Sequence, residues 1–240
     1  MKRALTFFAV LGLVAMLAGG ASANLLLNAA LDSPGGGATI DDWTKDESKT
    51  FSGPTSDLIT LEPWAGPSPT PVTANDEGGF FKAFQGNVTT GDLATCHLTQ
   101  DVAGAAGLTY LLSGWAGAEA NYSGFIPGTA TQSQLAIEFD DDNDRGNGIL
   151  GDSVLDLQAA GLGGVAGVAF GYQQFAVSGT APAGTTVVRA RVSMIDGYGN
   201  PAGGGQAFVI DDFSLSVVPE PASLTLIGLG LLGLVALRRR

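Results

Sequence analysis

Residues 188–194 read Val-Arg-Ala-Arg-Val-Ser-Met, an alternation of apolar and polar side chains. Because successive side chains of a β-strand point to opposite faces, this stretch predicts a strand whose apolar face packs inward. Arg189 and Arg191 are then expected on the opposite face. The same period in residues 134–139, Gln-Leu-Ala-Ile-Glu-Phe, predicts a second such strand. A last strand is predicted at residues 208–217, with Phe213, Leu215 and Val217 on one face.

Weaker patterns surround these strands. Further strands are predicted at residues 24–28, 58–61, 79–84, 94–102 and 108–117. Prolines remove ladder donors from residues 53–75, which are expected to be a surface loop or an edge crossing. Residues 161–171 are too rich in glycine for a stable helix and are expected as a loop or a poor strand. About eight to ten strands without intervening helices predict an all-β fold, an antiparallel β-sandwich of the jelly-roll kind.

The charge of the chain excludes one class of partner. The 240 residues carry a formal net charge of −12, but five of the 11 basic residues lie at the two ends. Six basic and 22 acidic residues remain between residues 24 and 218, which leaves a net charge of −16. A surface this negative repels nucleic acid and anionic lipid and suits divalent cations, so no nucleic-acid partner is expected.

Cys96 is the only cysteine, so the domain has no internal disulfide. The expected arrangement is a small buried thiol on a strand, next to an exposed imidazole at His97. A metal-binding pair formed by Cys96 and His97 is the weaker alternative.

The amino terminus has the order of a secretion signal. Lys2 and Arg3 precede an apolar run at residues 4–17, and Ala21-Ser22-Ala23 supplies the small residues that signal peptidase requires. Residues 1–23 are therefore predicted to be a helical signal peptide that is cleaved before Asn24. A retained membrane helix is the alternative, although the apolar run is short for a full span.

The carboxyl terminus has a second ordered signal. Pro219-Glu220-Pro221 precedes residues 222–237, which contain no charge, and three arginines end the chain. The prolines interrupt the preceding structure, and the arginines would keep the end of a membrane-spanning helix in the cytoplasm. The domain at residues 24–217 would then lie outside, with residues 218–240 as a separate tail.

This tail resembles the PEP-CTERM sorting signal. The resemblance implies recognition by an exosortase in the inner membrane of a Gram-negative-type bacterium and cleavage near Pro219, Glu220 and Pro221. It also implies transient membrane anchoring through the tail, then delivery to the cell surface, the biofilm or the exopolysaccharide matrix. An ordinary membrane anchor that happens to follow Pro-Glu-Pro is the alternative.

The domain itself resembles carbohydrate-binding modules of the jelly-roll, galactose-binding-like kind. The resemblance rests on the opening residues 24–32 and on residues 172–184 and 208–215. In that family an opening acid and an aspartate of the closing pair often share a structural calcium, which here implies Asp32 with Asp211 or Asp212. The family usually has Glu after an aromatic, where this chain has Asp32 after Leu31. Solvated or backbone-capping acids are the alternative.

A second candidate for calcium is the acidic stretch at residues 140–148. Asp140, Asp142 and Asp144 have the every-second-residue spacing of a calcium loop. Gly146 falls one position late and Gly151 stands where an EF-hand has its final acid, so EF-hand identity is excluded. A looser calcium loop and a soluble acidic hairpin turn both remain open.

Sugar binding would use aromatic rings on an open face, because a pyranose stacks its C–H side on a π system. Trp115, Tyr122 and Tyr198 are the candidates, and Trp43 and Trp64 are weaker because they lie near turns. For each ring, packing in the core is the alternative.

Enzymatic activity has little support in the sequence. The chain has one histidine and no Gly-x-Ser-x-Gly motif or phosphate loop, and its many acids make a chance carboxylate pair unavoidable. The sequence therefore favours an exported, non-catalytic protein, processed by signal peptidase and exosortase, that associates with extracellular polysaccharide. A structural surface-coat protein with calcium bridging and a glycan-processing enzyme are the two alternatives.

Overall fold

A computed structural model of the chain describes residues 23–32, 37–51, 57–63, 65, 77–83, 91–142, 148–164 and 168–218. Residues 24–216 form one compact unit. The predicted signal helix and sorting tail, with Ala21, Pro219, Glu220 and Pro221, lie outside the described residues. Within the described ranges, no helix is long and apolar enough to cross a membrane.

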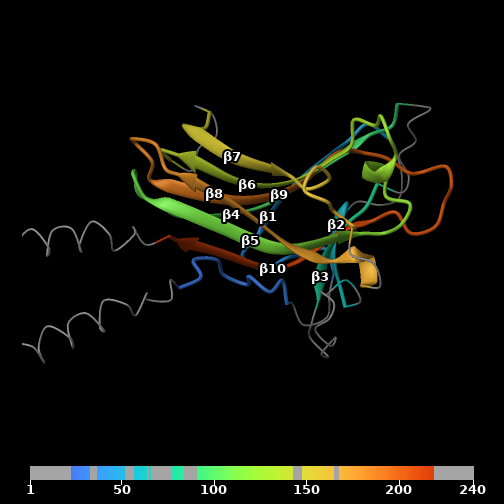
Figure 1. Ribbon diagram of the computed structural model, residues 1–240, viewed down its shortest axis with the longest axis horizontal. Coiled ribbons are helices and arrows are strands. Elements are labelled where there is room, and N and C mark those ends of the chain that lie inside the picture. The colour runs from blue at the N-terminus through green and yellow to red at the C-terminus, as the bar shows by residue number, and fades with distance from the viewer. Residues whose placement is uncertain are drawn as a thin grey trace, which may run out of the picture. The chain divides into compact units, whose positions relative to one another are not determined.

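The described residues form two five-stranded sheets, which Figure 1 shows packed as two layers. Sheet I has the order β1-β4-β9-β6-β7, and sheet II has the order β2-β3-β10-β5-β8. Neighbouring strands run antiparallel. The strands are β1 (Thr44–Lys49), β2 (Ile59–Glu62), β3 (Gly78–Phe81), β4 (Ala94–Ala103), β5 (Thr109–Ala118), β6 (Gln132–Asp140), β7 (Gly151–Asp156), β8 (Gln173–Thr180), β9 (Val187–Gly197) and β10 (Phe208–Val217). The prediction of an all-β antiparallel sandwich is confirmed.

The core lies between the two sheets. Tyr110 of sheet II contacts Phe139 of sheet I with ring centroids 6.2 Å apart, and both side chains are buried. Phe81 and Phe208, from neighbouring strands of sheet II, have centroids 5.3 Å apart. Burying each such ring contributes about 1.5–3 kcal/mol. The alternating residues of β9 behave as predicted, with Val188 and Val192 buried in this core.

The opening segment lies beside the closing strand β10. The Leu25 amide donates to the Leu215 carbonyl at 2.8 Å, and the Phe213 amide donates to the Ala29 carbonyl at 2.7 Å. Asn24 also bridges to β10, because its Oδ1 accepts from the Leu215 amide at 3.0 Å. The prediction of a strand at residues 24–28 is nevertheless wrong: Asn28 has φ 40° and the chain turns there instead of continuing a ladder.

Strand β1 was not predicted because its sequence, Thr-Lys-Asp-Glu-Ser-Lys, has no apolar face. It forms the edge of sheet I, and its full length pairs with β4 from Thr44 opposite Thr99 to Lys49 opposite Ala94. Charged residues are common on edge strands because they oppose pairing with other chains. Pairing with β4, and not local sequence, therefore makes this segment a strand.

Candidate functional site

The outer face of sheet I carries polar residues in register across three strands. Side chains that alternate with the buried ones must point away from the core, so the strand pairings define this face. From β4 through β9 to β6, the rows are His97, Ser193 and Gln134; then Thr99, Arg191 and Ala136; then Asp101, Arg189 and Glu138. We call these nine residues the polar face. Arg189 and Arg191 lie on it, as the alternation in β9 predicts.

An ion network joins the charged residues of the polar face. Arg189 forms a bidentate pair with Asp101, with Nε and Nη2 at 2.6 and 2.7 Å from the two carboxylate oxygens. Glu138 bridges both arginines, since its Oε2 lies 3.6 Å from Arg189 Nη1 and its Oε1 lies 2.5 Å from Arg191 Nε. The side chains of Arg189, Arg191 and Glu138 are only 5%, 11% and 12% exposed. Mutual contacts therefore replace much of their hydration and keep them in place.

The network continues to the far row of the polar face. Arg191 Nη1 donates to Ser193 Oγ at 2.6 Å and to Gln134 Oε1 at 3.3 Å. Ser193 Oγ lies 2.7 Å from Nδ1 of His97. Polar contacts thus link β4, β9 and β6 across the sheet. The sequence did not identify Asp101 or Glu138 as members of this site. The alternation in residues 134–139 does predict that Glu138 points to the face of the strand away from Ile137.

A groove of about 540 Å³ opens at the β1 side of this network. It is lined by Asp42, Thr44, Asp46, Thr99, Gln100, Asp101 and Arg189. Gln100 fixes one wall, because its Nε2 donates to the carbonyls of Leu27 and Asp42 at 2.9 and 3.0 Å. The lining therefore combines carboxylate acceptors, threonine hydroxyls and one guanidinium, a set of groups that can bind several hydroxyls at once.

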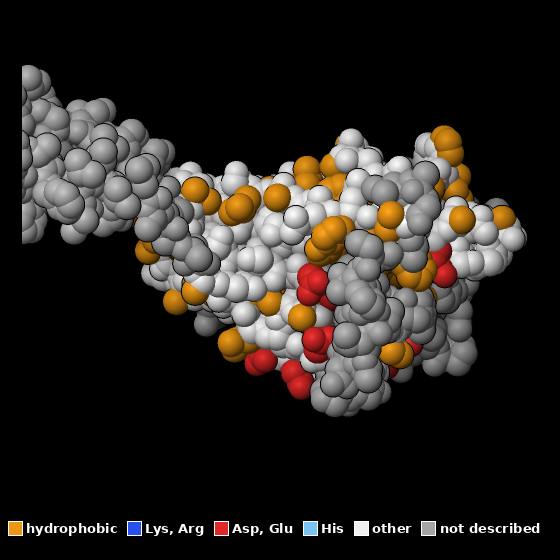
Figure 2. Space-filling view, turned by 60° about the horizontal axis from the view of Figure 1, so that its bottom comes forward, with side chains coloured by type: hydrophobic (Ala, Val, Ile, Leu, Met, Phe, Trp, Pro, Cys, Tyr) orange, Lys and Arg blue, Asp and Glu red, His pale blue; other side chains and the backbone are white. Residues whose placement is uncertain are grey.

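The cations of the described domain are largely paired with acids. Besides the two arginines, Lys45 lies 3.4 Å from a carboxylate oxygen of Glu47 and 3.1 Å from one of Asp57. Figure 2 shows acidic side chains, and no Lys or Arg, among the coloured residues of the face in view. The exposed charge on that face is therefore negative.

Tyr122 and Tyr198 do not offer the open rings that were expected. Tyr122 is 1% exposed, its hydroxyl lies 2.8 Å from Ser133 Oγ, and its ring stacks on Phe208 at a centroid distance of 6.0 Å. Burial raises the pKa of its phenol. Tyr198 is 5% exposed. Both rings are core side chains, which corrects the expectation that they form a platform for sugar.

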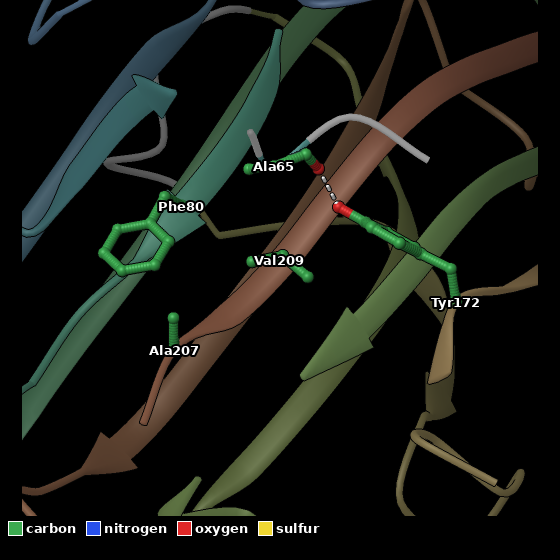
Figure 3. Close-up of a cluster of buried hydrophobic side chains, with 5 residues drawn as sticks. All are labelled: Ala65, Phe80, Tyr172, Ala207 and Val209. Atoms are coloured by element: carbon green, nitrogen blue, oxygen red, sulfur yellow. Dashed lines mark hydrogen bonds between the residues drawn. The ribbon is translucent and has the colours of Figure 1, made fainter. Parts of the chain in front are cut away.

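Trp115 lies on β5 and packs against a buried apolar cluster. Figure 3 shows this cluster, in which the Tyr172 hydroxyl donates to the Ala65 carbonyl. Its buried members are Ala65, Phe80, Tyr172, Ala207 and Val209. Trp115 stays partly exposed beside it. Among the weaker candidates, Trp43 is buried and donates to the Asn28 carbonyl at 3.1 Å, and Trp64 lies outside the described residues.

The predicted calcium ligands Asp32, Asp211 and Asp212 come from the two ends of the domain. Asp32 is exposed and its Oδ1 accepts from the Glu77 amide at 3.2 Å. Asp211 is buried and its Oδ1 accepts from the Asp212 amide at 2.7 Å, while Asp212 is exposed. None of the three belongs to a group of at least three acidic, His or Cys side chains among the described residues. The opening segment and β10 are adjacent, and a calcium ion shared by Asp32 with Asp211 or Asp212 stays a prediction.

The acidic stretch after β6 does form such a group. Asp140, Asp141 and Asp142 have carboxylate oxygens that all lie within 4.8 Å of one another. Asp144 lies outside the described residues. Asp141 was not among the predicted ligands, because strict alternation along a strand would point it away from its neighbours.

The alternative metal pair of Cys96 and His97 is excluded by the strand. Cys96 is buried in the core, whereas His97 lies on the polar face beside Ser193. Burial, followed by the nearby Glu47 carboxylate, raises the pKa of the Cys96 thiol well above its usual range. The thiol is therefore neutral and inert in the folded protein.

Comparisons with known proteins concern the tail and the fold. Residues 217–240 match the PEP-CTERM protein-sorting motif. No curated protein matches the chain. The enzymatically active domain of tailspike protein 4 from bacteriophage CBA120 is similar at 12% identity and a TM-score of 0.52, over 81% of this chain and 21% of that one. The match therefore takes in only about a fifth of the tailspike chain.

Two further solved structures resemble the domain. A cyclase from Fischerella sp. TAU is similar at 12% identity and a TM-score of 0.51, over 84% of this chain and all of that one. The carbohydrate-binding module TmCBM61, solved in complex with β-1,4-galactotriose, has 15% identity and a TM-score of 0.44, over 82% of this chain and all of that one. At 12% identity the likeness to the tailspike domain and to the cyclase shows the fold alone.

Proposed function

We propose that this chain is a non-catalytic protein of the bacterial cell surface that associates with extracellular polysaccharide through the groove beside the polar face. The sorting motif at residues 217–240 indicates export and sorting by an exosortase. Cleavage near Pro219, Glu220 and Pro221, after transient anchoring in the inner membrane, would release the domain to the surface or the biofilm matrix. The β-sandwich, in our proposal a galactose-binding-like jelly roll, would then be the part that contacts glycan.

The groove lining is the observation that carries this proposal. Asp46, Thr99 and Arg189 line the groove from three neighbouring strands of one sheet, and Asp46 is the exposed acceptor among them. The ion network keeps Arg189 and Asp101 in place before a ligand arrives, which lowers the conformational entropy lost on binding. A hydroxyl-rich ligand of several sugar units suits an open polar groove better than an apolar molecule does, because apolar ligands leave such groups without partners.

The test measures retention of the purified protein on the polysaccharide of its own host and on a panel of plain glucans. Asp46→Asn replaces one groove carboxylate, and we expect retention to fall about tenfold, as the loss of one hydrogen bond to a charged group predicts. Asp41→Asn is the matched control, because Asp41 is an exposed acid that does not line the groove. Loss of retention on Trp115→Ala with full retention of Asp46→Asn would instead assign binding to the outer face of sheet II.

A structural coat protein is the second candidate, and the exposed acidic side chains in Figure 2 favour it. Divalent cations could bridge such faces between copies of the chain. This function predicts calcium-dependent self-association and no retention on any polysaccharide. Light scattering of the purified protein with calcium and with chelator separates the two candidates.

A further inference from the structure

The last residue of β6 buries a carboxylate that lacks a complete set of partners. Asp140 is 2% exposed, and its Oδ2 has no hydrogen-bond partner. Its Oδ1 accepts from the Asp141 amide at 2.8 Å. A buried carboxylate oxygen without a donor or a cation is unfavourable, which points to a ligand that binds it.

Two further carboxylates converge on the same point. The ligand oxygens of Asp140, Asp141 and Asp142 lie within 4.8 Å of one another. Three carboxylates this close repel one another when they are charged, and a cation between them would reduce that repulsion. Oxygens on opposite sides of one calcium ion are about 4.6–5.2 Å apart, given Ca–O distances of about 2.3–2.6 Å. The spacing of the three groups is thus compatible with a single shared ion.

The backbone that carries these acids is tied to the start of β9. The Thr186 amide donates to the Asp140 carbonyl at 2.9 Å, and Thr186 Oγ1 donates to the Asp141 carbonyl at 2.6 Å. Asp140 itself pairs with Val187 in the ladder. Because two strands fix this backbone, the three carboxylates converge without support from a ligand.

We propose that Asp140, Asp141 and Asp142 bind one calcium ion at the end of β6, with water completing its coordination. Carboxylate oxygens are the donors that this hard cation prefers, and its flexible geometry tolerates three ligands from consecutive residues. Magnesium is less suited, because it requires near-ideal octahedral geometry at shorter distances. The site is separate from Asp32, Asp211 and Asp212 and does not depend on the groove, so either proposal can fail alone.

The experiment is a calorimetric titration of the chelator-treated protein with calcium chloride, together with thermal unfolding. We expect a dissociation constant of about 10⁻⁴–10⁻³ M, as in extracellular calcium modules, and a rise in Tm of roughly 3–10 °C at about 10 mM calcium. Magnesium chloride at the same concentration should raise Tm less. A larger rise with magnesium would overturn the assignment of the ion, and no binding of either ion would overturn the site.

Two variants locate the ion. Asp140→Asn replaces the buried carboxylate with an amide of the same shape. Asp142→Asn changes a partly exposed ligand, so it should disturb folding less. We expect each to weaken calcium binding at least tenfold and to abolish the rise in Tm. Asp41→Asn, an exposed acid outside the cluster, should keep both. If Asp142→Asn binds calcium with unchanged affinity, calcium binds elsewhere. The same conclusion follows from unchanged affinity in a folded Asp140→Asn variant.

Discussion

Each outer face of the sandwich contains a side chain that is almost fully buried, and the two have opposite chemistry. On sheet I the Arg189 side chain is 5% exposed, and on sheet II Phe80 is 6% exposed. Phe80 pairs with Val209 in the ladder and belongs to the apolar cluster that Ala65 and Tyr172 complete. Arg189 instead pairs with Asp101 and Glu138. Side chains on an outer face can therefore be shielded from water either by apolar contacts or by a network of charged groups.

The difference matters for binding. An apolar outer face must be covered by the chain itself, as it is at Phe80, or it would expose hydrophobic surface to water. A charged network pairs its members with one another and still leaves polar groups at its margin, as Asp46 and Thr99 are in the groove. For this reason sheet I is the stronger candidate for a ligand surface.

The largest expected effect tests the apolar face. Phe80→Ala should lower the free energy of unfolding by about 3–5 kcal/mol, because it removes a buried ring and leaves a cavity. Urea denaturation measures the loss. Leu111→Ala on the exposed side of sheet II is the control and should change stability by less than about 0.5 kcal/mol. Equal effects of the two variants would mean that the cluster contributes nothing specific.

The polar face should respond almost as strongly, for a different reason. Glu138→Ala leaves Arg189 and Arg191 buried without their shared partner, and we expect a loss of about 3 kcal/mol in the free energy of unfolding. Asp152→Ala changes the exposed residue opposite Glu138 on β7 and should have little effect. A loss below about 1 kcal/mol for Glu138→Ala would show that water, and not the network, solvates the arginines.

The buried thiol and phenol of the core are expected to make the folded domain less stable at alkaline pH. Burial raises the pKa of the Cys96 thiol well above its usual value of about 9.0, so the folded state keeps the thiol proton at a pH where the unfolded chain loses it. The contribution of Cys96 to stability is therefore fully present below pH 9. Above pH 9 the free energy of unfolding should fall by about 1.4 kcal/mol for each further pH unit. Tyr122 adds to the fall above pH 10. Cys96→Ala, compared with its own stability at pH 8, should show a smaller loss between pH 9 and 10.

The smallest effect concerns the hydrogen bond that closes the apolar cluster. Tyr172→Phe removes the hydroxyl that donates to the Ala65 carbonyl and should cost about 1 kcal/mol, measured by urea denaturation. The same substitution at Tyr110, whose hydroxyl accepts from the Ala105 amide, is a matched control for a buried phenol. If Tyr172→Phe is neutral while Phe80→Ala is costly, apolar packing alone covers sheet II.

Local sequence was sufficient where the pattern stands in consecutive residues. The alternation at residues 188–194 predicted both the buried face of β9 and the outward direction of Arg189 and Arg191. The sorting tail could also be predicted, because its motif at residues 217–240 is a signal of consecutive residues. Asp140, Asp142 and Asp144 were predicted together from their spacing; the structure groups the first two with Asp141, and Asp144 lies outside the described residues.

Tertiary structure alone decided which residues meet. The bond from Arg189 to Asp101 spans 88 positions, and the contact of Arg191 with Glu138 spans 53, so both depend on the register of β9 with β4 and β6. The charged strand β1 exists because β4 pairs with it, and Tyr122 is buried because Phe208 and Ser133 lie against it. Period and motif are properties of neighbours in the chain, whereas partners and burial depend on packing between strands that are distant in it.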